Sequence, residues 1–69
     1  MITIYYQYWS KKEGQMKPAE QTFYDINTAV RFCWSMKNRK MILLRWETFD
    51  SEENEEMYRR VNISAINGF

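Results

Sequence analysis

The sequence predicts an α+β fold, in which a three- to four-stranded antiparallel sheet carries one amphipathic helix on one face. Residues 2–9 and 41–49 alternate in character with the period of a strand. The apolar positions of residues 26–38 instead recur with the period of a helix. A chain of 69 residues has room for one core, so we expect a single domain over residues 1–69.

The N-terminal part of the chain is expected to form a hairpin. Every residue from 2 to 9 except Gln7 is β-branched or aromatic, which is typical of a strand. A turn containing Gly14 follows, because glycine accepts a positive φ without steric cost. Residues 15–24 are predicted to be a short or irregular strand, which must lie at a sheet edge because Pro18 cannot donate a hydrogen bond.

The predicted helix begins after Asp25, whose carboxylate is a favourable N-cap. Two further strands are expected at residues 41–49 and 57–65, with the acidic run 50–56 as the tip of a long hairpin between them. The element order is then β-(β)-α-β-β, and residues 67–69 form a loose tail. The expected core residues are Ala29, Val30, Cys33, Leu44, Trp46 and Val61.

The composition argues against an enzyme. The chain has no histidine, so it lacks a Ser-His-Asp or Cys-His pair and a general base that titrates near neutral pH. Cys33 is the only cysteine; it is expected to be a buried apolar residue, and a zinc site is disfavoured. There is no glycine-rich phosphate loop, and the acidic run lacks the glycine of a calcium loop. We therefore expect no catalytic residue, no cofactor and no metal.

The expected location is the cytoplasm. A single cysteine fits a reducing compartment. The first residues lack the basic leader and the cleavage site of a signal peptide. No apolar run approaches the roughly 20 residues that span a bilayer, so we expect no membrane partner.

Charge is distributed unevenly along the chain. The net charge is +1, but residues 47–56 contain six carboxylates and no basic residue. The remainder has ten basic and three acidic residues, and 10 − 3 gives +7. This acidic tip is the first candidate contact surface, and a protein with a basic surface is its expected partner. The alternative interpretation is a solvated turn that prevents edge aggregation and adds no stability. The residues of the tip are Glu47, Asp50, Glu52, Glu53, Glu55 and Glu56.

The second candidate surface is the sheet face that one helix leaves open. Strand alternation places Leu44 and Trp46 toward the helix and Leu43 away from it. Trp, Tyr and Arg dominate protein–protein contacts, and the same residues stack on single-stranded nucleic acid. A homodimer through this face is a third option. The residues expected on this face are Tyr5, Trp9, Arg45, Phe49, Tyr58 and Arg60.

Two stretches resemble small accessory proteins encoded by phages and prophages of Gram-positive bacteria. They are Phe23-Tyr24-Asp25-Ile26 leading into Ala29-Val30-Arg31-Phe32, and Leu43-Leu44-Arg45-Trp46 running into Phe49-Asp50. The resemblance implies a factor that binds and redirects a host enzyme. The leading hypothesis is therefore a non-enzymatic protein-interaction module, a phage-encoded modulator or inhibitor of a host protein. The alternative is a small protein that binds single-stranded nucleic acid through the aromatic and basic sheet face.

Overall fold

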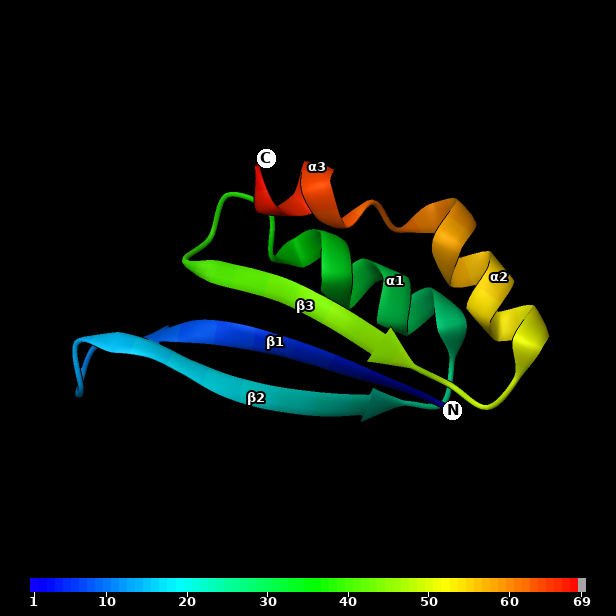
Figure 1. Cartoon of the computed structure of the whole chain (residues 1–69), viewed down its shortest axis with the longest axis horizontal. Coiled ribbons are helices and arrows are strands. Elements are labelled where there is room, and N and C mark those ends of the chain that lie inside the picture. The colour runs from blue at the N-terminus through cyan, green and yellow to red at the C-terminus, as the bar shows by residue number, and fades with distance from the viewer. Residues whose placement is uncertain (69) are drawn as a thin grey trace.

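Three strands and three helices make up the chain in a computed structural model that describes residues 1–68 (Figure 1). The fold is α+β with an antiparallel sheet, as the sequence predicts, and the strand order in the sheet is β2-β1-β3. The elements are β1 (Ile2–Ser10), β2 (Gln15–Phe23), α1 (Ile26–Ser35), β3 (Met41–Glu47), α2 (Ser51–Arg60) and α3 (Ile63–Asn67).

Strands β1 and β2 form a regular hairpin. They pair along their whole length, from Ile2 opposite Phe23 to Ser10 opposite Gln15. The edge position predicted for residues 15–24 is confirmed, but the strand is neither short nor irregular. Pro18 is accommodated because β2 has only one neighbour in the sheet.

Strand β3 contains a β-bulge that reverses the expected orientation of its central residues. Its register with β1 passes from Arg45 opposite Tyr5 to Leu43 opposite Tyr6, so Leu44 is one extra residue. Leu43 is consequently buried at 1% exposure, whereas Leu44 is 46% exposed. The predictions that Leu44 faces the core and Leu43 faces outward are both wrong. Trp46 lies beyond the bulge and packs partly buried against the core.

Helix α1 has the cap and the buried stripe that the sequence predicts. Asp25 Oδ2 accepts hydrogen bonds from the Thr28 N–H at 3.1 Å and the Thr28 hydroxyl at 2.9 Å. Ala29, Val30 and Cys33 are buried on the side that faces the sheet. The helix ends at Ser35, and the basic residues that follow it belong to the loop before β3.

The predicted hairpin tip at 50–56 and the predicted strand at 57–65 are wrong, because these residues form α2 and α3. Asp50 caps α2 by accepting from the backbone N–H groups of Glu52 and Glu53. Acidic residues in the first turn and Arg59 and Arg60 in the last turn both favour the helix dipole. The fold therefore has three helices and no strand after β3 within residues 1–68.

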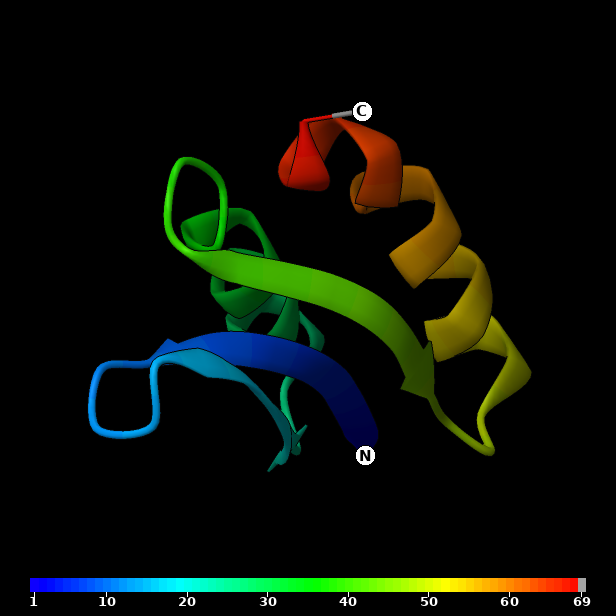
Figure 2. The same ribbon diagram turned by 60° about the vertical axis from the view of Figure 1, so that its left-hand side comes forward.

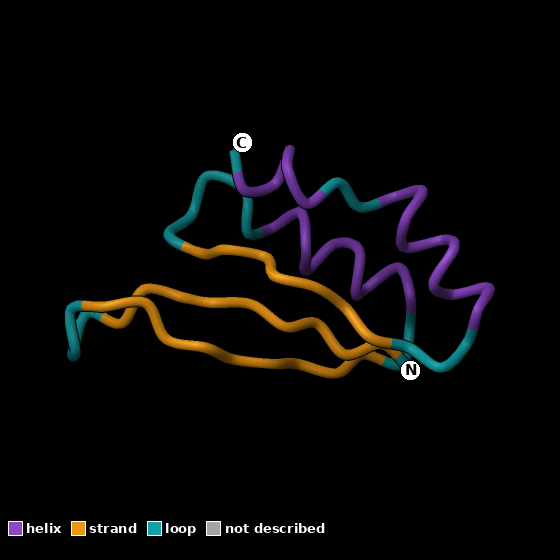
Figure 3. The backbone as a smooth tube through the Cα atoms, viewed as in Figure 1, coloured by secondary structure: helices purple, strands orange, loops and turns teal. Residues whose placement is uncertain are grey.

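The helices are arranged around one face of the sheet and its β3 side. Helix α1 packs on one face, α2 packs beside α1, and α3 runs next to β3 (Figures 2 and 3). The buried core between them contains Ile2, Ile4, Ala29, Val30, Cys33, Met36, Leu43, Met57, Val61 and Ile66. No helix of residues 1–68 covers the opposite face, which we call the open face. None of the described helices is both long and apolar enough to cross a bilayer.

Candidate functional site

The acidic residues gather around the start of α2 and have partners inside the molecule. Glu47 ends β3, Asp50 caps α2, and the other four lie along this helix. Arg59 lies 3.0 Å from a Glu56 carboxylate oxygen and 3.8 Å from one of Glu55. Arg45 lies 3.3 Å from Glu47. Much of the acidic charge is thus paired within the chain.

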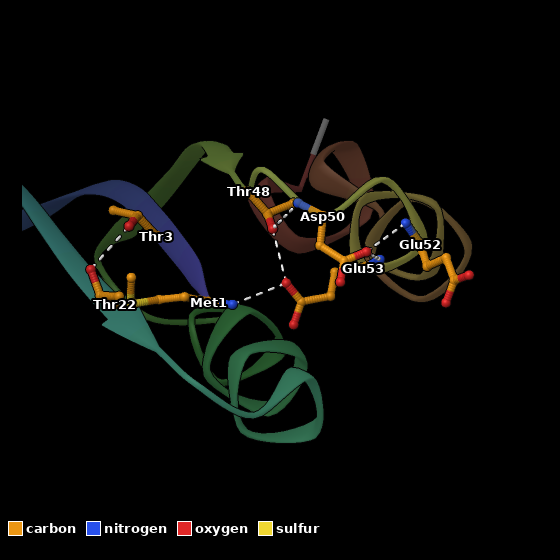
Figure 4. A network of polar contacts seen from close by, with 7 residues as sticks. All are labelled: Met1, Thr3, Thr22, Thr48, Asp50, Glu52 and Glu53. Atoms are coloured by element: carbon orange, nitrogen blue, oxygen red, sulfur yellow. Dashed lines mark hydrogen bonds and ion pairs between the residues drawn. The ribbon is translucent and has the colours of Figure 1, made fainter.

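A hydrogen-bond network holds the loop between β3 and α2 (Figure 4). The Thr48 hydroxyl accepts from the Asp50 N–H at 3.2 Å and donates to Glu53 Oε1 at 2.9 Å. Glu53 Oε1 also accepts from the Met1 ammonium at 3.1 Å. Asp50 Oδ1 accepts from the Glu52 and Glu53 N–H groups at 2.9 and 3.2 Å. The residues on both sides of position 49 are therefore fixed.

Phe49 lies between these fixed residues and is 100% exposed. It belongs to this loop and not to the open face, so its predicted placement is wrong. A shallow depression beside it is lined by Met1, Thr3 and residues 47–50. We call this exposed aromatic residue and its surroundings the acidic knob, which consists of Glu47, Thr48, Phe49, Asp50, Glu52 and Glu53.

The open face holds three of the six residues predicted for it: Tyr5, Trp9 and Arg45. The Arg45 guanidinium stacks on the Tyr5 ring at 4.0 Å and also bonds Glu47. Glu20 lies opposite Tyr5 on β2. The centre of this face is therefore neither strongly basic nor a free aromatic platform.

Tyr58 and Arg60 lie on α2 and not on the open face, because their segment is a helix. The Tyr58 ring meets Trp46 edge-on, with the ring centroids 5.0 Å apart. The Arg60 guanidinium donates to Asn27 Oδ1 at 2.7 Å, and its backbone carbonyl accepts from Trp34 Nε1 at 2.8 Å. The predicted aromatic and basic sheet face is thus not assembled as a whole.

The sequence reasoning missed a hollow at the other end of the sheet. The Trp9 N–H donates to the Lys40 carbonyl at 3.0 Å, and the Lys40 ammonium lies 5.5 Å from the centroid of the Trp9 ring. A hollow of about 390 Å³ opens beside this pair. We call it the basic hollow, and its main lining residues are Trp9, Met16, Arg39, Lys40, Met41 and Ile42. The available signal was the density of basic residues at positions 37–40.

Among residues 1–68, two titrating groups have clearly shifted pKa values. Burial raises the pKa of the Cys33 thiol to about 11, so this thiol stays protonated at neutral pH. The two hydrogen bonds from Thr28 lower the pKa of Asp25, which fits its role as a helix cap. Among residues 1–68, no group of three or more potential ligands is placed to hold a metal ion.

Comparison of the chain with protein-family models, curated proteins and solved structures gave no match.

Proposed function

We propose that this chain is a non-enzymatic protein-interaction module that docks on the basic surface of a protein partner through the acidic knob. The observation that carries the proposal is the full exposure of Phe49 in a loop whose neighbouring residues are fixed by hydrogen bonds. A large apolar side chain at the centre with charged groups around it has the anatomy of a protein–protein contact.

The rigidity of the loop favours binding. Ordering a flexible loop on association costs free energy, and the network around Thr48, Asp50 and Glu53 has already ordered this one. Moving the Phe49 ring from water into an apolar pocket stabilises a complex by about 2 kcal/mol. The carboxylates of Glu47 and Glu52 would surround that contact and speed the approach of a basic partner.

The expected partner follows from this chemistry. It has an apolar pocket that accepts one aromatic ring, with Lys or Arg side chains around it. The resemblance to phage accessory proteins favours a host protein in the host cytoplasm, which the chain would modulate or inhibit. A surface that normally receives nucleic-acid phosphates is one such surface, because it presents cations to carboxylates as it does to phosphates.

Photo-crosslinking from position 49 tests the proposal. The photoreactive residue p-benzoylphenylalanine is placed at position 49, or at position 9 as a matched aromatic site at the other end of β1. Each protein is irradiated in an extract of the native host. We expect a protein adduct from position 49 that position 9 does not give. Excess unlabelled wild type should abolish the adduct, and so should a Trp9→Ala competitor.

Loss of competition by a Phe49→Ala competitor identifies the knob as the contact. Removing a central aromatic anchor should weaken the complex about thirtyfold, which corresponds to ~2 kcal/mol. Equal competition by Phe49→Ala and wild type would contradict the proposal. An adduct between two copies of the chain would replace the proposal with a homodimer.

A further inference from the structure

The basic hollow lies at the opposite end of the sheet from the acidic knob. Tyr8 pairs with Met41 at the end near the hollow, and Thr3 pairs with Glu47 at the end near the knob. The molecule is 38 Å long, so the two surfaces are separate. A function of the hollow therefore goes beyond the function proposed for the knob.

The hollow combines an apolar floor with cations at its rim. Met16, Met41 and Ile42 line it, together with the Trp9 ring, which is 39% exposed. Arg39 and Lys40 supply the cations. Planar aromatic ligands stack on such a ring, and guanidinium and ammonium groups bind phosphate oxygens.

Charge around the hollow is not neutralised within the described part of the chain. Among residues 1–68, no carboxylate lies within 4 Å of Lys37, Arg39 or Lys40. Lys11 and Lys12 lie in the turn that follows β1, near the same end of the sheet. Glu13 in that turn is held by Lys17 at 2.7 Å. An anionic ligand is therefore favoured at this end of the molecule.

We infer that the basic hollow binds a nucleotide unit, with the base stacked on Trp9 and the phosphate held by Arg39 and Lys40. The volume of about 390 Å³ lies within the roughly 300–1,000 Å³ range of small-ligand sites. Asn67 also lines the hollow, but its amide is already bonded to the Leu43 backbone, so it forms a wall and does not select a base. The unit is a free nucleotide or one residue of a single strand.

The three indole N–H groups give a direct test by ¹H–¹⁵N correlation spectra. Trp34 Nε1 donates to the Arg60 backbone carbonyl at 2.8 Å, and Trp46 Nε1 donates to Asn54 Oδ1 at 3.0 Å. The protein is titrated at low salt with thymidine monophosphate and, separately, with a single-stranded oligothymidylate. We expect the Trp9 indole signal to move while the other two stay in place. Similar affinity for both ligands identifies a free nucleotide, and much tighter binding of the oligomer identifies a single strand.

Substitutions at the hollow distinguish the contribution of base stacking to nucleotide affinity from the contribution of charge. Trp9→Ala should weaken binding about tenfold or more. Lys40→Gln keeps the backbone carbonyl that accepts from the Trp9 N–H. It should reduce the slope of log affinity for the oligothymidylate against log salt by about 0.7. Arg31→Gln removes a basic residue of α1 that does not line the hollow, and Phe49→Ala alters the knob. Both should bind nucleotide as the wild type does.

Three results would overturn the inference. They are an unmoved Trp9 indole with both ligands at low salt, equal movement of all three indole signals, and equal loss of affinity in Arg31→Gln and Lys40→Gln. A peptide with the sequence of residues 47–54 tests the competing ligand class. If that acidic peptide shifts the Trp9 indole and neither nucleotide ligand does, the hollow is a protein-docking site. Failure of the knob to bind a protein leaves these readouts unchanged, so the two proposals fail separately.

Discussion

The side-chain amide of Asn67 pairs with the backbone of Leu43 through two hydrogen bonds. The Leu43 N–H donates to Asn67 Oδ1 at 2.9 Å, and Asn67 Nδ2 donates to the Leu43 carbonyl at 2.9 Å. Strand β3 lies at the edge of the sheet, so these groups have no neighbouring strand to bond. Asn67 takes the place of that strand, and it attaches α3 to the sheet. The prediction of a loose tail is therefore wrong at Asn67, while Phe69 lies outside the described residues.

Replacing Asn67 by alanine should destabilise the fold by about 1–3 kcal/mol, because a partly buried N–H and C=O lose their partners. Chemical denaturation measures the loss, and hydrogen exchange should accelerate at the Leu43 amide. Asn67→Asp keeps the acceptor but turns a carboxylate oxygen toward the Leu43 carbonyl. At neutral pH Asn67→Asp should therefore be less stable than Asn67→Ala. This difference in the free energy of unfolding should shrink when acid protonates the introduced carboxylate. Wild-type stability and exchange in Asn67→Ala would show that the pairing is unimportant.

Because of the β-bulge, we expect very different losses of stability when two adjacent leucines are replaced by alanine. Leu43→Ala should cost about 2–5 kcal/mol, because it leaves a cavity in the core. Leu44→Ala should change the stability by no more than about 0.5 kcal/mol, because this side chain is largely exposed. Thermal or urea unfolding of the two variants measures the difference. A larger loss of stability in Leu44→Ala than in Leu43→Ala would contradict the bulge and favour the simple alternation that the sequence predicts.

Local patterns sufficed for β1 and α1 but not for the interior of β3. The alternation in residues 2–9 and the cap at Asp25 are properties of a continuous segment, which the sequence displays directly. The bulge at Leu44 is a property of two strands, because it depends on how β3 aligns with β1. The alternation in one segment cannot reveal the bulge. The sequence therefore predicts the wrong side of the sheet for both Leu43 and Leu44.

The region after β3 was mispredicted although it contained a helix signal. Asp50 followed by Glu53 three residues later is an N-terminal capping pattern, and Glu55 precedes Arg59 with helical spacing. The alternation of residues 57–65 predicts a strand instead. A strand there would also place Tyr58 and Arg60 on the sheet. The grouping of carboxylates was predictable from their closeness in sequence. The basic hollow was not, because it is formed by the ends of three strands together with the loop before β3 and with α3.

The cap at Asp25 should have a measurable acid titration. The Thr28 hydroxyl and N–H lower the pKa of this carboxyl from its ordinary value of 3.8. A lowered folded pKa means that the cap contributes stability above about pH 4, which is lost as the pH falls through the folded value. Thr28→Ala removes the hydroxyl and should raise the Asp25 pKa toward 3.8, as followed by carboxyl ¹³C shifts. Asp25→Asn keeps a capping oxygen and should lack this acid dependence. An Asp25 pKa that is the same with and without the Thr28 hydroxyl would contradict this.

The Cys33 thiol should react only after the protein opens. Burial raises its pKa to about 11 and also blocks access to it. Reaction with Ellman's reagent at neutral pH should be slow in the native protein and fast in urea. The pKa of this thiol is higher in the folded than in the unfolded protein. Its contribution to the stability of the fold is therefore complete below the unfolded pKa and is lost as the pH rises toward 11. Cys33→Ala should therefore lose less stability than wild type in this alkaline range. Rapid labelling of the native protein would contradict the burial of Cys33.

Neutralising the carboxylates of α2 should destabilise the fold, contrary to the expectation that they form a solvated tip. Glu52 and Glu53 lie in the first turn, where negative charge favours the helix dipole, and Glu55 and Glu56 both pair with Arg59 about one turn later. Each of these four interactions on the exposed helix surface contributes about 0.3–0.5 kcal/mol. A variant with all four residues changed to Gln should therefore lose about 1–2 kcal/mol of the free energy of unfolding. Urea denaturation measures the loss.

Two single variants show where that stability resides. Glu53→Ala breaks the contacts with Thr48 and the Met1 ammonium, which also position the loop that carries Phe49. Glu52→Ala removes a first-turn charge but no side-chain partner among residues 1–68. We expect Glu53→Ala to be clearly less stable than Glu52→Ala and to bind the partner of the knob more weakly. If the two variants are equally stable, the network does not hold the loop. The rigidity on which the proposed contact at Phe49 depends would then have to come from the Asp50 cap alone.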